Sequence, residues 1–496
     1  MAEHFISRID AENDLLACAA YLAESIPPGE THAAAVATVV PYYLENSNVD
    51  LAAELANSVD DPFTRDRLLI GVAAKCAELD DDEYAMQLVE AIEDPGFQSQ
   101  GYEQLGSIKA QKGELEKAGE IITMMLHPDA VLGRIAIRQV SDRDDEAAMR
   151  TIGEIEFPRD AVMALCAIAA EKIVGGDNEK AAECLSLAEG KTAEIEHDEE
   201  RIRSFCEIAN LYVDAGDKGR AFQVYETARN EAENLDGTQR DPLLAQVAIG
   251  FLSAGSVDLA DRTLDAISDK TQIASVVVAF ARDHWHKEER DEAIEALDEA
   301  YEILRSQHEN ETRDSRAKFV MMGTVAGQFA GFQKLERAIE VADSIPDDTQ
   351  KTNALSQIAQ IAATQGEYAV ADQAASEIKG ELDRALTIMA MGRNAKNAGD
   401  IEKADSLLNS ASNAIANLPD PSARYTALTE LCKVHFANDN ATAAVEAFDR
   451  SFSTVLEIRN SNFKISGLAE MSKILRDFGL DMTDERREVL RRFLQA

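Results

Sequence analysis

Acidic side chains gather in two short clusters that could do chemistry. The clusters are residues 80–82 (DDD) and 142–146 (DRDDE). Carboxylates at this density could bind calcium, but neither cluster has the loop glycine and the distal glutamate of an EF-hand. Each cluster directly precedes an expected helix, and the N-terminus of a helix favours negative charge. We therefore interpret both clusters as helix caps rather than as calcium sites.

The histidines and cysteines are dispersed along the chain. His284 and His286 flank Trp285, but helix residues at i and i+2 point to different sides. His284 and His435 also take a core-facing position of the repeat pattern described below, which favours packing over metal binding. The cysteines have no metal-site spacing and lie in apolar helical patterns, so we expect buried free thiols in a reducing compartment. They are Cys18, Cys76, Cys166, Cys184, Cys206 and Cys432.

The sequence contains no motif of a known catalytic site. It has no phosphate-binding loop, no dinucleotide-binding glycine fingerprint, no G-x-S-x-G nucleophile elbow and no H-E-x-x-H zinc motif. We therefore expect a protein that is not an enzyme and that uses no cofactor and no metal.

The composition narrows the class of partner. The formal net charge is −42, from 91 acidic and 49 basic residues. Phosphate recognition needs clustered positive charge, so we expect neither nucleic acid nor an anionic membrane as the partner. No uncharged apolar run reaches the ~18 residues of a membrane-spanning helix, and no signal peptide is visible. These features predict a cytoplasmic protein.

The strongest pattern in the sequence is an alanine at nearly fixed spacing. Successive steps are 33, 33, 30, 33, 40, 39, 33, 45, 33, 33 and 40 residues. This period predicts a stacked array of helix pairs, in which each repeat packs against its neighbours. The alanines are Ala52, Ala85, Ala118, Ala148, Ala181, Ala221, Ala260, Ala293, Ala338, Ala371, Ala404 and Ala444.

Residues 201–228 show one complete repeat. Phe205 and Tyr212 follow the spacing of a first helix, and Ala221 lies on a second helix. Gly216-Asp217 separates the two, because glycine accepts the left-handed conformation of a C-cap and aspartate caps the next helix. The same turn recurs at Gly113-Glu114, Gly176-Asp177, Gly255-Ser256, Gly366-Glu367 and Gly399-Asp400.

A second small residue lies twelve positions before almost every periodic alanine, directly after a bulky residue. Val72-Ala73, Leu105-Gly106 and Ile208-Ala209 are examples. Small residues on both helices allow a close crossing, and the bulky residues fill the layers between repeats. This register resembles the tetratricopeptide repeat over about residues 30–460. The tryptophan that often opens the family's pattern is absent, and the family's tyrosine remains only at Tyr212.

The resemblance implies an all-α fold: a right-handed superhelical solenoid of about twelve helix-turn-helix repeats with capping helices. We expect an N-terminal capping helix in residues 1–29, repeats one to eight in 30–306, repeats nine to twelve in 307–460, and C-terminal capping helices in 461–496. The polar stretch 307–316 (QHENETRDSR) predicts a flexible connection. Second helices near 181–197, 221–236, 293–308 and 404–417 are expected to be longer than the others. The basic segment ERREVLRRFLQA at the C-terminus either has mixed charge as a cap or docks on an acidic surface of its own or another chain.

The resemblance also implies where a ligand would bind. In the family, first helices line the concave face and extended peptides or helices lie along it. The register places residues one and four after the first small residue on this face. These positions are small and apolar in the N-terminal half, but basic and aromatic in the C-terminal half. The candidate peptide-binding residues are Asn210, Arg282, Trp285, Gln360, Arg393, Lys396 and Lys433.

Two interpretations of this basic row stay open. It could bind an acidic segment or a C-terminal carboxylate, with Trp285 as an apolar anchor. It could instead neutralise acidic residues on adjacent repeats. The expected function is a non-catalytic scaffold that binds a peptide or protein segment in its concave groove. A ligand-responsive regulatory solenoid is the first alternative. The second is an α-helical superhelix enzyme with carboxylates as acid and base, for which the inward positions offer no acidic pair.

Overall fold

The computed structural model describes residues 5–307 and 315–495, and every regular element in these ranges is an α-helix. The chain forms two compact units. Unit 1 contains Met1–Val131 and Ile388–Ala496, and unit 2 contains Leu132–Thr387. Most of the connection expected at 307–316 lies outside the described residues, because the description omits 308–314.

Unit 1 is built from both ends of the chain. Its helices are α1 (Arg8–Ala11), α2 (Leu15–Glu24), α3 (Glu30–Glu45), α4 (Val49–Asn57), α5 (Pro62–Glu78), α6 (Asp82–Glu90), α7 (Pro95–Lys112), α8 (Leu115–Ile122), α24 (Ile401–Ala416), α25 (Pro421–Ala437), α26 (Ala441–Glu457), α27 (Ser461–Asp477) and α28 (Asp484–Gln495).

Unit 2 contains the middle of the chain. Its helices are α10 (Asp145–Ile152), α11 (Pro158–Val174), α12 (Asn178–Thr192), α13 (Asp198–Asp214), α14 (Lys218–Glu233), α15 (Arg240–Ala254), α16 (Val257–Leu264), α17 (Lys270–His286), α18 (Arg290–Ser306), α19 (Ser315–Gly331), α20 (Leu335–Asp343), α21 (Asp348–Thr364) and α22 (Tyr368–Glu377). The boundaries between the units fall inside α9 (Asp129–Ser141) and α23 (Glu381–Asn397).

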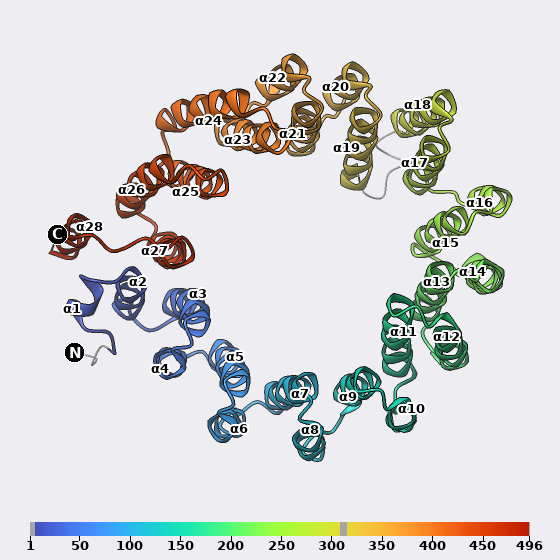
Figure 1. Cartoon of the computed structure of the whole chain (residues 1–496), viewed down its shortest axis with the longest axis horizontal. Helices are drawn as coiled ribbons and strands as arrows, with labels where there is room; N and C mark the ends of the chain where they lie inside the picture. Colours follow the sequence, from blue (N-terminus) through green and yellow to red (C-terminus); the bar gives the residue numbers. More distant parts are fainter. Residues whose placement is uncertain (1–4, 308–314, 496) are drawn as a thin grey trace. The chain divides into compact units, whose positions relative to one another are not determined.

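Consecutive helices pair as hairpins, as the alanine period predicts. Within unit 2, Figure 1 shows the odd-numbered helices α11 to α21 on the inner side of a curve and their even-numbered partners outside. The periodic alanines lie on the second helix of each hairpin and are between 0% and 2% exposed. Alanine therefore occupies the crossing of each helix pair, where a larger side chain would push the helices apart.

The hairpin turns share one backbone feature. The residue five positions before each periodic alanine has a positive φ. It is glycine at the six turns that the sequence predicts, which confirms those turns: Gly113, Gly176, Gly216, Gly255, Gly366 and Gly399. At the other turns the same conformation is held by Ser47, Asp80, Arg143, Glu288, Gln333 and Asp439. The turn geometry is therefore fixed by the repeat and does not depend on glycine.

The lengths of the second helices explain the uneven period. The second helices α12, α14, α18 and α24 have 15 to 17 residues, whereas α6, α8, α10 and α16 have 8 or 9. The predicted long second helices are confirmed, and α26 adds another of 17 residues. The N-terminal capping helix expected in residues 1–29 is divided into two helices. Asp14 has extended backbone and its side chain caps the N-terminus of α2, so α1 and α2 are separate helices.

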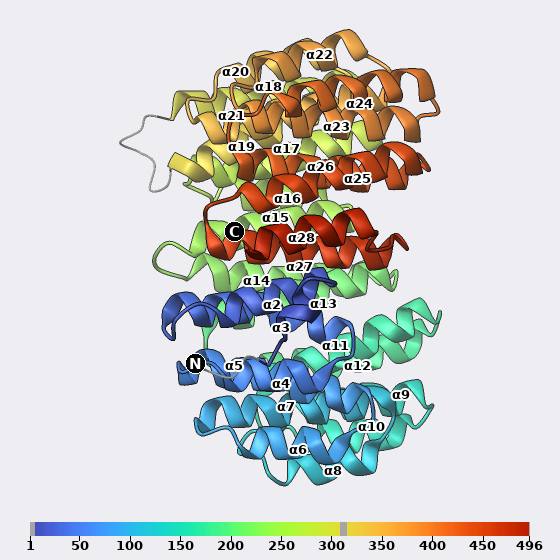
Figure 2. The same cartoon turned by 90° about the vertical axis from the view of Figure 1, so that its left-hand side faces the viewer.

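The two ends of the chain pack against each other inside unit 1. Helix α27 lies beside α2 and α3 (Figures 1 and 2). Leu15 and Ala19 of α2 and Leu468 and Ala469 of α27 are all fully buried. The expected terminal helices therefore do not simply close a stack towards solvent, because each end covers the apolar side of the other.

The polar groups of the molecule follow the expected pattern. All six cysteines are free and buried, as predicted. Burial raises the pKa of the Cys18 and Cys206 thiols to about 12, which keeps these thiols protonated and unreactive. In the described ranges, no helix is long and apolar enough to cross a membrane.

Candidate functional site

One pocket lies on the inner side of unit 2, on three consecutive first helices. Its volume is about 310 Å³, and its lining comes from α13, α15 and α17. The lining residues are Asn210, Pro242, Ala245, Gln246, Ile249, Gly250, Ser253, Gln272 and Ser275. None of them is charged. Side-chain amides and hydroxyls on a small apolar floor can donate and accept hydrogen bonds without selecting for charge.

Asn210 is held in this pocket by a tyrosine of the neighbouring outer helix. The Tyr225 hydroxyl donates a hydrogen bond of 2.5 Å to Asn210 Oδ1. Burial raises the pKa of Tyr225, so the hydroxyl keeps its proton and stays a donor. A Cβ at Gly250 would come within 2.3 Å of the Tyr225 ring, so only glycine leaves room for this ring. The bond occupies the amide oxygen of Asn210, which leaves its NH₂ group able to donate.

Two further amides have no internal partner. In the described part of the chain, the side-chain amides of Gln246 and Gln272 make no hydrogen bond. Both residues are half-buried at the pocket. By contrast, the Ser253 hydroxyl donates to the Ile249 carbonyl and the Ser275 hydroxyl to the Gln272 carbonyl. The glutamine amides are therefore the groups in this pocket most available to a ligand.

The register of the repeat did not point to these glutamines. Gln246, Ile249, Gly250 and Ser253 lie at i, i+3, i+4 and i+7, which places them on one helix face. The signal was this uncharged polar stripe, which begins before the small residue Ala248. The register assigns only positions after the small residue to the inner face, so Asn210 is the one predicted site residue that lines the pocket.

The other predicted residues of unit 2 have different surroundings. Trp285 stacks on Phe332 with ring centroids 4.1 Å apart, and the Arg290 guanidinium lies 3.7 Å from the indole centroid. A ring and a guanidinium this close cannot share one face, so both faces of Trp285 are covered. Gln360 donates to the Ser356 hydroxyl at 3.2 Å. Arg282 is exposed and has no ion pair among the described residues.

The predicted residues of unit 1 are mostly paired with acids. Lys433 Nζ lies 2.8 Å from both Glu430 and Glu470. Burial alone would lower the pKa of Lys433, but these two carboxylates raise it above its ordinary value. Lys396 lies 3.6 Å from Asp439, whereas Arg393 is exposed and has no ion pair among the described residues. Acidic residues therefore neutralise Lys433 and Lys396. Arg282 and Arg393 are exposed cations without an ion pair among the described residues, and we call these two the open cations.

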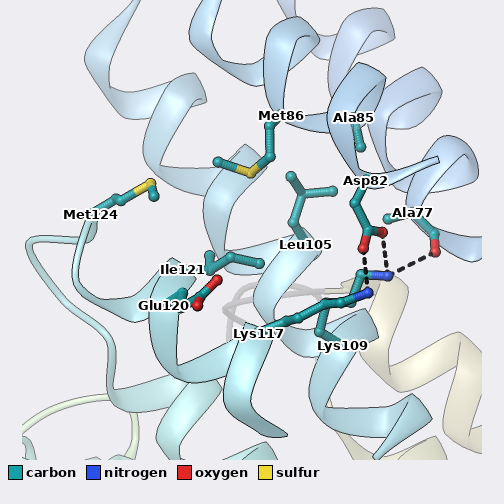
Figure 3. Close-up of a pocket in the computed structure, with 10 residues that line it drawn as sticks. All are labelled: Ala77, Asp82, Ala85, Met86, Leu105, Lys109, Lys117, Glu120, Ile121 and Met124. Atoms are coloured by element: carbon teal, nitrogen blue, oxygen red, sulfur yellow. Dashed lines mark hydrogen bonds and ion pairs between the residues drawn. The ribbon is translucent and has the colours of Figure 1, made fainter. Parts of the chain in front are cut away.

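A second pocket of about 310 Å³ lies in unit 1 between the outer helices α6 and α8. Figure 3 shows Met86 and Met124 on one side, and Asp82, Lys109 and Lys117 on the other. Hydrogen bonds to Asp82 and Glu114 raise the pKa of Lys117, so this amine stays protonated. A protonated, neutralised lysine is not a nucleophile, and this pocket offers apolar contact rather than chemistry.

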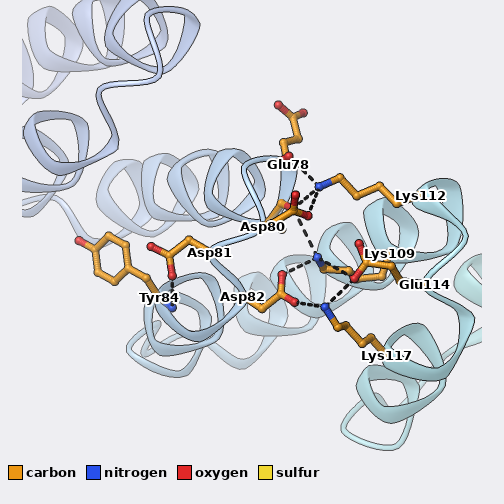
Figure 4. Close-up of polar contacts among 10 residues, drawn as sticks. Glu78, Asp80, Asp81, Asp82, Tyr84, Lys109, Lys112, Glu114 and Lys117 are labelled. Carbon is orange, nitrogen blue, oxygen red and sulfur yellow. Dashed lines mark hydrogen bonds and ion pairs between the residues drawn. The ribbon is translucent and has the colours of Figure 1, made fainter.

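The acidic clusters cap helices and hold lysines, as shown in Figure 4 for the first of them. Asp81 accepts a hydrogen bond from the Tyr84 backbone at the start of α6, and Asp144 does the same for Ala147 in α10. Asp82 forms ion pairs with Lys109 and Lys117. Burial opposes ionisation of Asp82, but both ammonium groups hold its pKa below the ordinary value. The interpretation of these clusters as caps is confirmed.

The histidines differ in their packing. His435 is 8% exposed, and burial lowers its pKa. His284 is instead partly exposed, and its Nδ1 lies 2.6 Å from a carboxylate oxygen of Glu289. Among the described residues, no group of three or more His, Cys, Asp and Glu side chains is arranged to hold a metal ion.

The successive hairpins and their common register define the chain as an all-α array of helix hairpins, and this register resembles that of the tetratricopeptide repeat. No protein-family model matches the sequence, and no curated protein matches it. Solved structures align with it only at low similarity, as three examples show. The apo quorum sensor NprR from B. thuringiensis is 11% identical, with 66% of this chain and 97% of that chain covered and a TM-score of 0.27.

The other two structures are similarly distant. The Rap protein complexed with Competence and Sporulation Factor is 14% identical, with 57% and 88% covered and a TM-score of 0.23. The APC/C hetero-tetramer Cut9-Hcn1 is 13% identical, with 92% and 93% covered and a TM-score of 0.23. Alignments this weak say nothing about the function of this chain.

Proposed function

We propose that this protein is a non-catalytic scaffold that binds an extended peptide or protein segment on its inner first helices. The observation that carries the proposal is the uncharged pocket of α13, α15 and α17, with the two unpartnered amides of Gln246 and Gln272. A carboxamide offers one acceptor and two donors, which match the alternating C=O and N–H groups of an extended backbone. Such a pocket holds the main chain of a ligand and leaves its side chains to other contacts.

The open cations could provide a second contact to the same peptide ligand. Arg282 is on α17, the helix that also provides Gln272 and Ser275 to the pocket. An exposed guanidinium without an internal ion pair can bind a carboxylate bidentately. The expected ligand in unit 2 is therefore a segment whose backbone lies on the amides and which carries an acidic side chain or its C-terminal carboxylate. Arg393, Lys396 and Lys433 stay candidate contacts of unit 1.

Selection from a random-sequence peptide display library tests the proposal without a known partner. Wild-type protein should enrich peptides that the variant Gln246→Ala/Gln272→Ala binds at least tenfold more weakly, because two backbone hydrogen bonds are lost. Arg282→Glu should weaken acidic peptides selectively. Arg305→Glu on α18 is the matched control, because this exposed arginine already pairs with Glu302 and lies outside the candidate site. Equal binding of every selected peptide by wild type and the double-alanine variant would contradict the groove assignment.

A further inference from the structure

The two ends of the chain pack against each other in unit 1, and the helices in this contact are more than 400 residues apart in the sequence. One side consists of α2 and α3 and the other of α27, with Glu12 before α2 and Arg491 of α28 at the edge; we call this contact the end junction. Its apolar layer is complete. The buried residues are Leu15, Leu16, Ala19, Ala20 and Ala23 on α2, and Ile465, Leu468, Ala469 and Met471 on α27. Neither face could stay exposed in water without leaving a long apolar strip uncovered.

The polar edge of the end junction has opposite charge on its two sides. Glu45 at the end of α3 pairs with Lys473 at 2.8 Å and with Arg476 at 2.9 Å. Arg476 also hydrogen-bonds to Asn46. Arg491 of α28 lies 3.8 Å from Glu12, so the basic C-terminal helix docks on an acidic residue of its own chain. In each of these ion pairs across the junction, the acidic group is on the N-terminal side and the basic group is on the C-terminal side.

The end junction differs from every other contact between neighbouring hairpins in how it is tethered. Elsewhere a loop of a few residues joins neighbouring hairpins and keeps them at a high effective concentration. Across the end junction, the covalent connection is the rest of the chain, from residue 46 to residue 460. The two faces are therefore not joined to each other by a short turn. The two faces are also different surfaces, so the contact is head-to-tail and a second molecule can supply either side.

We propose that the end junction also forms between copies of this chain. The α2–α3 face of one molecule then binds the α27–α28 face of another through the same apolar layer and the same ion pairs. The net charge of −42 on each copy opposes association over long distances. At ~0.15 M salt the Debye length is about 8 Å, so this repulsion is screened while the directly paired groups still attract. The inference does not depend on the ligand of the inner pocket.

Site-directed cross-linking distinguishes a contact between copies from the contact within one chain. One batch of full-length protein carries Asn46→Cys and one tag, and a second batch carries Lys473→Cys and a different tag. The batches are mixed at ~0.15 M salt, incubated overnight so that junctions that open spontaneously can exchange partners, and treated with a short bis-maleimide. The native thiols are buried with raised pKa values, so they react slowly and wild-type protein measures the background.

The expected result is a cross-linked species that carries both tags and increases with protein concentration. Each batch treated alone should give none of it, since a head-to-tail contact pairs residue 46 only with residue 473. Adding Glu45→Lys to the first batch should lower the yield about fivefold, and adding Arg476→Glu to the second should restore it.

A chain with both cysteines reports the contact within one molecule. If that chain cross-links internally while the mixture stays at the wild-type background, the end junction is purely intramolecular and the proposal is wrong. The proposal is equally overturned if neither sample cross-links.

Discussion

At the scale of single residues, the hairpin turns show that the fold determines the backbone conformation of the turn, and that the side chain determines its energetic cost. The residue five before the alanine adopts a left-handed conformation in every repeat, whether it is glycine or not. A side chain in this conformation costs about 1–2 kcal/mol, because its Cβ crowds the following carbonyl. The packing of the two helices imposes this cost at Arg143 and Glu288, and glycine avoids it at Gly176 and Gly216.

Arg143→Gly should stabilise the protein. Arg143 is exposed with φ of 69°, so glycine removes the strain of the left-handed conformation. The greater freedom of glycine in the unfolded chain offsets part of the gain, which leaves ~0.5–1 kcal/mol. Urea unfolding followed by circular dichroism measures the change. Gly176→Ala is the control: no atom lies within 4 Å of the added Cβ, so any loss of stability comes from its φ of +78°. A lower unfolding midpoint for Arg143→Gly would contradict this account.

His435 should make the protein less stable as the pH falls. Burial lowers its pKa in the folded state below the ordinary value of ~6.5, although Asp405 and Glu446 act in the opposite direction. From about pH 7.5 to 5.5 the unfolded chain takes up a proton that the folded chain excludes, so folding weakens until the folded pKa is reached. His435→Gln should flatten this part of the stability curve. Parallel curves for wild type and variant over this range would show that His435 titrates normally.

The candidate site was predicted only in part, and residue-scale reasons explain why. The repeat register correctly assigned Asn210 to an inner helix, because that position follows from spacing alone. It missed Gln246 and Gln272, which lie on the preceding turns of their helices. The covered faces of Trp285 come from Arg290 on the next helix and Phe332, 47 residues away. A spacing rule within one repeat cannot show such contacts.

At the scale of helices, two aspartates hold successive hairpins together in the same way. Asp82 pairs with Lys109 and Lys117, and Asp145 with Lys172 and Lys180, at the same offsets of 27 and 35 residues. In each case the first residue of a second helix binds one lysine from the first helix and one from the second helix of the next repeat. The offsets are visible in the sequence, but their meaning depends on which helices become neighbours.

Asp82→Asn should destabilise the protein more than Asp145→Asn. Lys109 is 2% exposed and would keep only its longer contact of 3.4 Å with Glu114, so the loss of the Asp82 carboxylate leaves a buried charge that is poorly compensated and costs ~2–3 kcal/mol. Lys172 has a side chain that is 16% exposed, and water compensates part of the loss there. Thermal unfolding of both variants gives the comparison. Adding Lys109→Met to Asp82→Asn should recover most of the loss, since it removes the poorly compensated buried charge. No recovery would show that Asp82 stabilises the fold by other contacts.

At the scale of the whole molecule, the fold class was predictable and the end junction was not. The alanine period determines that helices stack as hairpins, because each repeat needs only its neighbours. The contact of α2 with α27 involves residues more than 400 positions apart, and no repeat contains information about it. The basic C-terminal segment was the only sign, and it left open which acidic surface the segment meets.

The melting temperature should rise with salt. A net charge of −42 destabilises any compact state through self-repulsion, and screening relieves this repulsion. Between ~0.01 and ~0.5 M sodium chloride we expect the melting temperature to increase by several degrees. Salt weakens both the surface ion pairs and the long-range repulsion, and the loss of the repulsion has the larger effect on stability. Differential scanning calorimetry in sodium chloride, with an uncharged osmolyte as control, measures it. A constant or falling melting temperature would mean that the ion pairs outweigh the repulsion.

Because of the end junction, the fold does not require the chain to start at one particular hairpin. Because Arg491 lies 3.8 Å from Glu12, segments near the two ends of this chain are close together, and a short linker of glycine and serine can join them. New termini can then be opened at the exposed Gly237, between α14 and α15. Such a circular permutant keeps every hairpin and turns the end junction into an ordinary, covalently linked step of the array.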